Sequence, residues 1–236
     1  MEKELWEACK DGKVEEVIKQ LQNSQINTNC QDVEYSRTPL YIACEKGQVE
    51  IVKLLLVDER VDVNKSDNRY DETPFFVACR LGHVDVVKIL LGDQRVDVNK
   101  TKNDKTPFSI ACEKGQVEVV KLLLKDERVD VNQTRKSGFT PFYVACQIGH
   151  LEVVKVLLND KRVDINKADH YGQTPFYVAC YWGKIEIVKL LLNDKRISTK
   201  KKTNKGKTVT DIAKEEKRSN IVKLMKEFDT GNYNQL

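Results

Sequence analysis

Cysteine and histidine are the residues of this chain whose chemistry could form an active centre or a metal site. The chain holds seven cysteines and three histidines among 236 residues. Six cysteines follow an alanine at one place in a recurring segment, and none has the C-x-x-C spacing of a zinc site. The histidines form no metal-binding spacing, and the chain has no phosphate-binding or nucleophile motif. We therefore expect no metal, no cofactor and no catalysis.

The recurring segment organises the whole chain. Its fullest form is Thr-Pro-Phe-Tyr-Val-Ala-Cys, and it recurs at intervals of 33 to 35 residues. The Thr-Pro pairs begin at Thr38, Thr73, Thr106, Thr140 and Thr174, with a degenerate copy at Thr208. A period of about 33 residues is typical of a helical solenoid, in which each unit hides its apolar face by stacking on its neighbours. Such an array exposes a long surface and encloses no pocket, so the sequence favours a binding protein.

One unit contains the signals for two helices and a loop. Thr174 is a good N-cap, and Pro175 suits the first helical position because its missing N–H does no harm there. Gly183 ends the first helix, and residues 185–192 form a second helix that is apolar nearly all round. An extended hairpin loop rich in Asp, Asn and Lys leads to the next unit. The fold class predicted is all-α.

The cysteines fit this arrangement as core residues. Helices of adjacent units lie about 8–10 Å apart, whereas a disulfide needs Cα atoms within roughly 7 Å. We therefore expect buried thiols and a reducing compartment. Cys30 alone falls in a loop, where we expect it to be exposed. The buried six are Cys9, Cys44, Cys79, Cys112, Cys146 and Cys180.

These motifs resemble the ankyrin-repeat family. The matching residues are Asp169-x-x-Gly172-x-Thr174-Pro175, Gly82-His83, Gly149-His150 and Asp62-Val63-Asn64. The resemblance implies an ankyrin-repeat solenoid of helix-turn-helix units joined by β-hairpin-like loops. Where the family has histidine, this chain has Tyr41, Phe76, Ser109, Tyr143 and Tyr177, so the family's histidine hydrogen bonds must be replaced.

We expect one ankyrin-repeat domain over residues 1–228, followed by a polar tail over 229–236. Both end repeats carry polar residues where internal repeats are apolar, as capping repeats require. The expected repeats are 1–36 (N-terminal cap), 37–70, 71–104, 105–138, 139–172, 173–206 and 207–228 (C-terminal cap).

The resemblance also implies where a partner docks: on the concave side, built from hairpin tips and first helices. The two residues between Ala-Cys and the inter-helix glycine should face that groove, and Tyr181 and Trp182 are the aromatic members of this series. Tyr and Trp often dominate binding energy, so we expect them to anchor a partner. The alternative is that they shield the junction with the shorter C-terminal repeat. Other expected contacts are Ile148, Leu81, Arg135, Lys136, His170 and Tyr171.

Two charge patterns suggest further surfaces. A ladder of arginines, with Asp two residues before each one, indicates ion pairs between repeats rather than a phosphate site. Residues 195–226 carry twelve Lys or Arg and three Asp or Glu, so this stretch is basic. It could attract nucleic acid, an acidic lipid surface or an acidic protein segment, or it could be a solubilising cap surface. Its densest part is Lys200, Lys201, Lys202, Lys205 and Lys207.

We conclude that the sequence favours a protein–protein interaction scaffold. The alternative is a polyanion binder that uses the basic C-terminal repeat, and a third possibility is a modular spacer with no dedicated partner. We expect a monomer in the cytoplasm or nucleus, because the charged N-terminus lacks the apolar core of a signal peptide. No apolar run reaches the roughly 18 residues that span a bilayer.

Overall fold

The computed structural model of the protein describes residues 2–231, and this part contains fourteen helices. Apart from one isolated bridge between Lys102 and Lys105, the described residues contain no β-structure. The all-α prediction is therefore confirmed. The chain forms two compact units, one up to Asp130 and one from Val131. The end of the predicted polar tail, residues 232–236, lies outside the described residues, whereas Asp229 is the last residue of α14.

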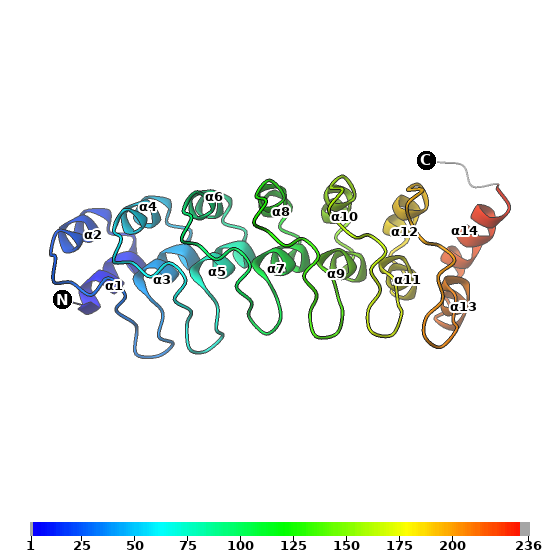
Figure 1. The fold of residues 1–236 in the computed structure, drawn as a ribbon, viewed down its shortest axis with the longest axis horizontal. Helices are drawn as coiled ribbons and strands as arrows, with labels where there is room; N and C mark the ends of the chain where they lie inside the picture. Colours follow the sequence, from blue (N-terminus) through cyan, green and yellow to red (C-terminus); the bar gives the residue numbers. More distant parts are fainter. Residues whose placement is uncertain (1, 232–236) are drawn as a thin grey trace. The chain divides into compact units, whose positions relative to one another are not determined.

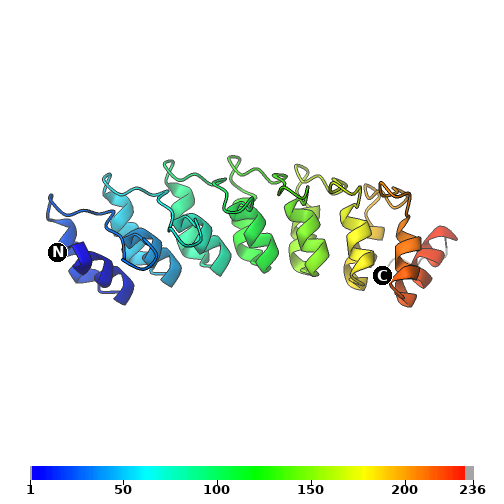
Figure 2. The same cartoon turned by 90° about the horizontal axis from the view of Figure 1, so that it is seen from below.

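The first unit consists of four helix pairs in two rows (Figure 1). First helices pack on first helices and second helices on second helices, while each pair also packs internally. The connecting loops project beyond the row of first helices, and they lie along one edge of this unit in Figure 2. The helices are α1 (Glu2–Asp11), α2 (Val14–Leu21), α3 (Pro39–Lys46), α4 (Val49–Val57), α5 (Pro74–Leu81), α6 (Val84–Gly92), α7 (Pro107–Lys114) and α8 (Val117–Leu123).

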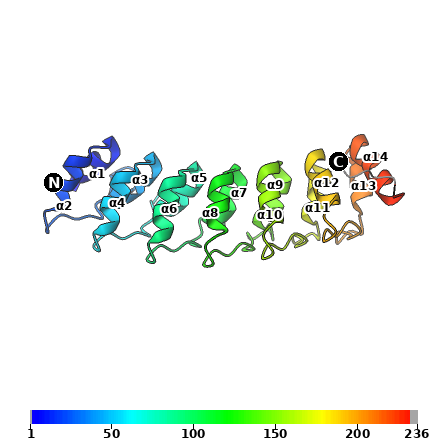
Figure 3. The ribbon, with the colours of Figure 1, turned by 90° about the horizontal axis from the view of Figure 1, so that it is seen from above.

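The second unit repeats this arrangement with three helix pairs. Figure 3 shows α9 beside α10 and α11 beside α12. Its last pair forms the C-terminal end of the described helices. The helices are α9 (Pro141–Ile148), α10 (Leu151–Leu158), α11 (Pro175–Tyr181), α12 (Ile185–Leu192), α13 (Val209–Glu215) and α14 (Ser219–Asp229).

The Thr-Pro pairs start the first helices as predicted. In α5, the Thr73 side chain accepts a hydrogen bond from the backbone N–H of Phe76, and Pro74 occupies the first turn. Gly47 ends α3 with φ +69°, and a Cβ there would lie 2.8 Å from the His83 ring. Glycine is therefore required both by the left-handed backbone and by close packing. His83 itself bonds the carbonyl oxygen of Glu45 through Nε2 (3.0 Å), which is a structural role.

The cysteines behave as core residues, with one correction. All seven are present as thiols. Burial raises the pKa of Cys9 to about 12, and nearby Cys30 adds to this rise. Burial also raises the pKa of Cys44 far above the ordinary thiol value. The expectation that Cys30 is exposed was wrong, because its loop folds back beside α1 and leaves the residue only 6% exposed.

Tyrosine replaces the family's histidine as a link between repeats. The hydroxyl of Tyr41 donates to the buried carboxylate of Glu72 in the next repeat (3.3 Å). In the second unit, the Tyr143 hydroxyl lies 3.1 Å from Asp169 Oδ2 and 3.4 Å from Gln173 Oε1. Both tyrosine rings are buried in the helix row. The expectation that other hydrogen bonds replace those of the family's histidine is confirmed at Tyr41 and Tyr143.

An asparagine forms a second link between repeats. Asn64 donates through Nδ2 to the Arg95 carbonyl (2.7 Å) and accepts from the Asp97 N–H through Oδ1 (2.8 Å). One side chain therefore satisfies two backbone groups of the next loop. The pattern repeats at Asn29, Asn99, Asn132 and Asn166.

The prediction of inter-repeat ion pairs in the arginine ladder was wrong. Arg95 pairs with Asp93 of its own repeat, at 2.6 Å between Nη2 and Oδ2. The two residues are only two apart, and Asp93 also accepts the Arg95 backbone N–H, so the turn closes locally. The same guanidinium then donates to the Leu56 carbonyl at the end of α4 (2.8 Å). The link between repeats is thus a hydrogen bond from a cation to a helix C-terminus, which the helix dipole favours.

This arrangement predicts a pH-dependent stability. The hydrogen bond from Arg95 lowers the pKa of Asp93 below its ordinary value. The stabilisation is therefore complete above the unfolded pKa of about 3.9 and is lost as pH falls through the lower folded pKa. We expect Asp93→Asn to reduce the free energy of unfolding at about pH 6 and to differ less from wild type at about pH 3. Urea unfolding at both pH values measures this, and an equal loss at both would contradict it.

Candidate partner-binding site

The predicted aromatic pair lies at the surface of the second unit. Tyr181 is the last residue of α11, and Trp182 caps that helix. Trp182 is 48% exposed, whereas Tyr181 is half-buried. Their rings meet edge-to-face, with centroids 5.2 Å apart and planes at 73°. Arg218 Nε donates to the Tyr181 carbonyl (3.2 Å), which holds this helix end against the last repeat.

Tyr181 forms one wall of a cavity of about 430 Å³. The cavity lies between α11, α13 and the loop of residues 197–207, which we call the lysine hairpin. Sequence reasoning treated the aromatic pair and the basic patch as separate surfaces. In the structure, residues of both line one pocket, although Trp182 itself does not. The principal lining residues are Tyr171, Tyr177, Tyr181, Lys205, Lys207 and Ile212.

Backbone hydrogen bonds fix the lysine hairpin beside Tyr171. The Asn204 N–H donates to the Tyr171 carbonyl (2.9 Å), and Asn204 Nδ2 donates to the His170 carbonyl (2.9 Å). The hairpin is closed by the Gly206 N–H, which donates to the Thr203 carbonyl (2.8 Å). Tyr171 is 64% exposed, so its ring stands at the pocket rim. Hydrogen bonds from Asn204 to two main-chain carbonyls of the preceding hairpin therefore hold the pocket rim in place.

The charges around the pocket are unequal. Lys207 forms an ion pair with Glu215 on α13 (2.5 Å), and that hydrogen bond raises the pKa of Lys207. Burial raises the pKa of Tyr177, so this phenol stays protonated at neutral pH. Lys205 is exposed on the hairpin and has no ion pair in the part of the chain that the structure describes. The hairpin side of the pocket therefore carries the positive charge of Lys205, whereas Glu215 and Glu216 lie on its α13 side.

The other predicted contact residues lie outside this pocket. Ile148 ends α9 and is 39% exposed. Arg135 and Lys136 belong to the loop before α9, whose Ser137 carbonyl accepts from the His170 N–H (3.3 Å). Leu81 is also 39% exposed, but it ends α5 in the first unit. The structure brings Tyr171 and Tyr181 together and leaves the rest as separate surface positions.

Comparison with known protein families decides the identity of the fold. A family model described as "Ankyrin repeats (3 copies)" matches residues 5–102 and 94–169, and a model described as "Ankyrin repeats (many copies)" matches residues 149–192. The chain belongs to the ankyrin-repeat family. A search of curated proteins found no match for it.

Ankyrin repeats generally mediate protein–protein interaction and are generally non-catalytic. Within residues 2–231, no group of three or more His, Cys, Asp or Glu side chains could hold a metal ion. No helix in this same part is long and apolar enough to cross a membrane.

The first unit also contains a stack of cations and aromatic rings that the sequence alone did not predict. The guanidinium of Arg69 lies 4.7 Å from the Tyr35 ring centroid and 4.8 Å from that of Tyr70. Arg37 covers Tyr35 at 4.8 Å, and Lys102 covers Tyr70 at 4.8 Å. These contacts join three successive hairpins of the ankyrin repeats. Tyr35 and Tyr70 lie three residues before Thr38 and Thr73, so their positions recur, but the residue types alone did not indicate contacts between hairpins.

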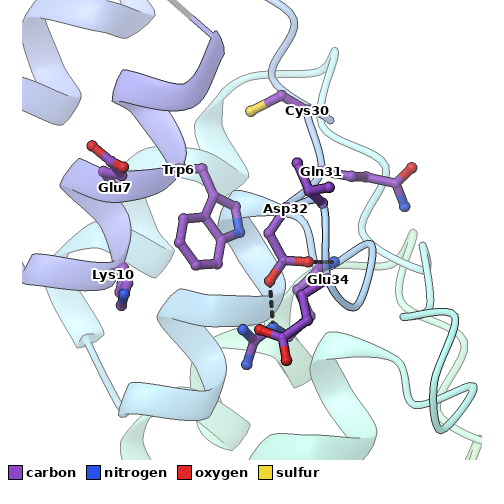
Figure 4. A pocket seen from close by; sticks show the side chains of 9 residues that line it. Trp6, Glu7, Lys10, Cys30, Gln31, Asp32 and Glu34 are labelled. Carbon is purple, nitrogen blue, oxygen red and sulfur yellow. Dashed lines mark hydrogen bonds and ion pairs between the residues drawn. The ribbon is translucent and has the colours of Figure 1, made fainter.

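The first ankyrin repeat also carries a cavity, of about 580 Å³ (Figure 4). Trp6 projects from α1 toward the loop that holds Cys30 and Asp32. Its indole Nε1 is buried without a hydrogen-bond partner among the described residues. Acidic and basic side chains both line this cavity, so its charge favours neither sign of ligand. The pocket of the second unit is lined by three tyrosines and by Lys205, which has no ion pair among the described residues, so it is the better candidate site.

Proposed function

We propose that the protein is a protein–protein interaction scaffold whose partner docks on the hairpins and first-helix ends, with Tyr181 and Trp182 as anchors. The observation that carries this proposal is the exposure of Trp182, which is 48% accessible although its neighbours Cys180 and Ala179 are fully buried. An exposed indole on a rigid helix end is a common binding hot spot. The other proposed contacts are Ile148, Arg135, Lys136, His170 and Tyr171 in the second unit and Leu81 in the first unit.

The wider proposal follows the family. Residues 1–228 act as one ankyrin-repeat domain with the repeat boundaries given above, the protein is a monomer in the cytoplasm or nucleus, and it catalyses no reaction. The family's general role in protein binding supports this proposal. Binding of nucleic acid or acidic lipid through the lysine hairpin is the competing outcome in the experiment below.

The test is affinity capture with wild type and the variant Tyr181→Ala/Trp182→Ala. We expect the variant to lose the partner, because truncating one hot-spot residue commonly costs about 2 kcal/mol or more of binding energy. We expect its melting curve to stay nearly unchanged. The matched control is Val57→Ala/Val84→Ala, which removes two exposed apolar side chains from the first unit and should keep the partner.

Three results would reject the proposal. A large loss of stability in the double variant would mean that the aromatic pair shields the junction with the last repeat. Capture that depends on salt and not on the aromatic pair would indicate a polyanion ligand. Absence of any captured protein would favour a spacer.

A further inference from the structure

The lysine hairpin and the pocket beside it form one surface that combines aromatic side chains with positive charge. The pocket has tyrosine walls, and its open rim carries lysines. We propose that this surface binds an acidic segment of the partner protein, which inserts one aromatic or large aliphatic side chain between Tyr171, Tyr177 and Tyr181. This inference rests on the proposed function, and it adds the chemical class of the partner and the place where its anchor sits.

The pocket suits an inserted apolar side chain. Its volume of about 430 Å³ lies within the range of about 300–1,000 Å³ that is usual for ligand pockets. Ile212 of α13 is 4% exposed and Tyr177 of α11 is 4% exposed, so both are fixed by packing. Tyr181 is half-buried and Tyr171 is exposed, so their rings remain available to contact a ligand. A rigid wall and two accessible rings together favour an aromatic or aliphatic anchor.

The charges suit an acidic segment. Among the described residues, Lys200, Lys201 and Lys205 have no ion pair, and all three are exposed. Lys207 is already paired with Glu215, and Lys202 interacts with Asp211. No acidic residue occurs between Ile197 and Lys207, so the hairpin itself offers no compensating charge. An approaching carboxylate would therefore gain attraction at the rim without displacing an existing pair.

The same geometry favours a peptide over a nucleic acid. Glu215 and Glu216 line the α13 side of the pocket, where Glu215 is paired with Lys207. A phosphate backbone carries a charge at every nucleotide and would meet these carboxylates as it crossed the pocket. A peptide can place an uncharged side chain there and keep its acidic residues on the rim. The carboxylates thus discriminate between the two classes of ligand.

The test uses defined probes and a fluorescence signal at the site. Trp6 and Trp182 are the two tryptophans of the chain, so Trp6→Phe leaves Trp182 as the single emitter. Trp182 contacts Tyr181 edge-to-face and should report occupation of the pocket. The probes are a short peptide of glutamate and aspartate with one central phenylalanine, the same peptide with serine in the centre, and a single-stranded oligothymidylate of equal charge.

We expect the phenylalanine peptide to bind at least about tenfold more tightly than the serine peptide and to change Trp182 emission. Lys205→Glu should weaken binding of the phenylalanine peptide by about tenfold, because a carboxylate would replace an ammonium at the rim. Lys195→Glu makes the same charge change at an exposed lysine outside the pocket, and it should weaken binding less than about twofold because salt screens distant charges.

Several results would overturn the proposal. These are equal affinity for the two peptides, tighter binding of the oligothymidylate, or equal effects of Lys205→Glu and Lys195→Glu. The test separates this inference from the function on which it rests. If Tyr181→Ala/Trp182→Ala removes the natural partner but neither peptide binds, the scaffold function stands and the acidic class is wrong. If the phenylalanine peptide binds but Tyr181→Ala/Trp182→Ala still captures the natural partner, the pocket binds acidic peptides and the proposed docking site of the partner is wrong.

Discussion

Phe75→Ala is expected to reduce the free energy of unfolding by about 3–5 kcal/mol. Phe75 follows the Thr-Pro pair of α5 and is fully buried. α5 packs against both α3 and α7 within the first unit, so the cavity would open between two interfaces at once. Because repeat arrays are stabilised mainly by contacts between neighbours, losing both interfaces should affect the whole unit. Urea unfolding followed by circular dichroism measures the loss.

The control is Phe75→Leu. Leu40 occupies the corresponding place after the Thr-Pro pair of α3 and is also fully buried. Leucine is therefore compatible with this slot of the repeat, and we expect a cost below about 1.5 kcal/mol because the volume changes little. If alanine and leucine had the same small effect, the seam between the first helices would not be the main source of stability.

The local structure of each repeat could be predicted because its signals are local. Thr38 caps a helix through a bond to a backbone group three residues away, and Gly47 ends that helix through its own dihedral angles. Both effects depend on residues close in the sequence. The fold class followed from the repetition of these signals, since a helix with two apolar sides needs a neighbour on each.

Contacts between repeats could not be predicted in the same way. The sequence places Arg95 in an expected ion-pair ladder and Asn64 in a motif of the family, yet each side chain bonds backbone groups of a neighbouring repeat. Every repeat offers many carbonyls and N–H groups, and residue types do not indicate which one a long side chain reaches. Cys30 was misjudged for the same reason, because burial of a loop depends on how it folds back.

The candidate site shows this limit most clearly. Tyr181 and Lys205 were identified from residue type and position, but as parts of two separate surfaces. Their common location depends on the bond from the Asn204 N–H to the Tyr171 carbonyl, which brings successive hairpins together. Residue types alone indicated which residues could bind a partner. Only the structure shows that Tyr181 and Lys205 line the same pocket.

The second large effect concerns Glu72, which is 2% exposed and binds three side chains. Its carboxylate accepts from Arg80 Nη2 (2.9 Å), from Lys102 Nζ (2.5 Å) and from the Tyr41 hydroxyl (3.3 Å). Glu72→Ala would leave two partly buried cations and one buried hydroxyl without this acceptor. Removing one member of a buried charge cluster is strongly destabilising, so we expect a loss on the order of 3 kcal/mol.

The chain itself provides the conservative variant for this position. Gln173 precedes Thr174 as Glu72 precedes Thr73, and it lies within 3.4 Å of the Tyr143 hydroxyl. Glu72→Gln keeps an acceptor oxygen and the side-chain volume, so we expect a smaller loss of about 1 kcal/mol. Urea unfolding of both variants measures the difference. Surface substitutions usually change the free energy of unfolding by no more than about 0.5 kcal/mol. A change of that size for Glu72→Ala would therefore contradict a stabilising role of the buried cluster.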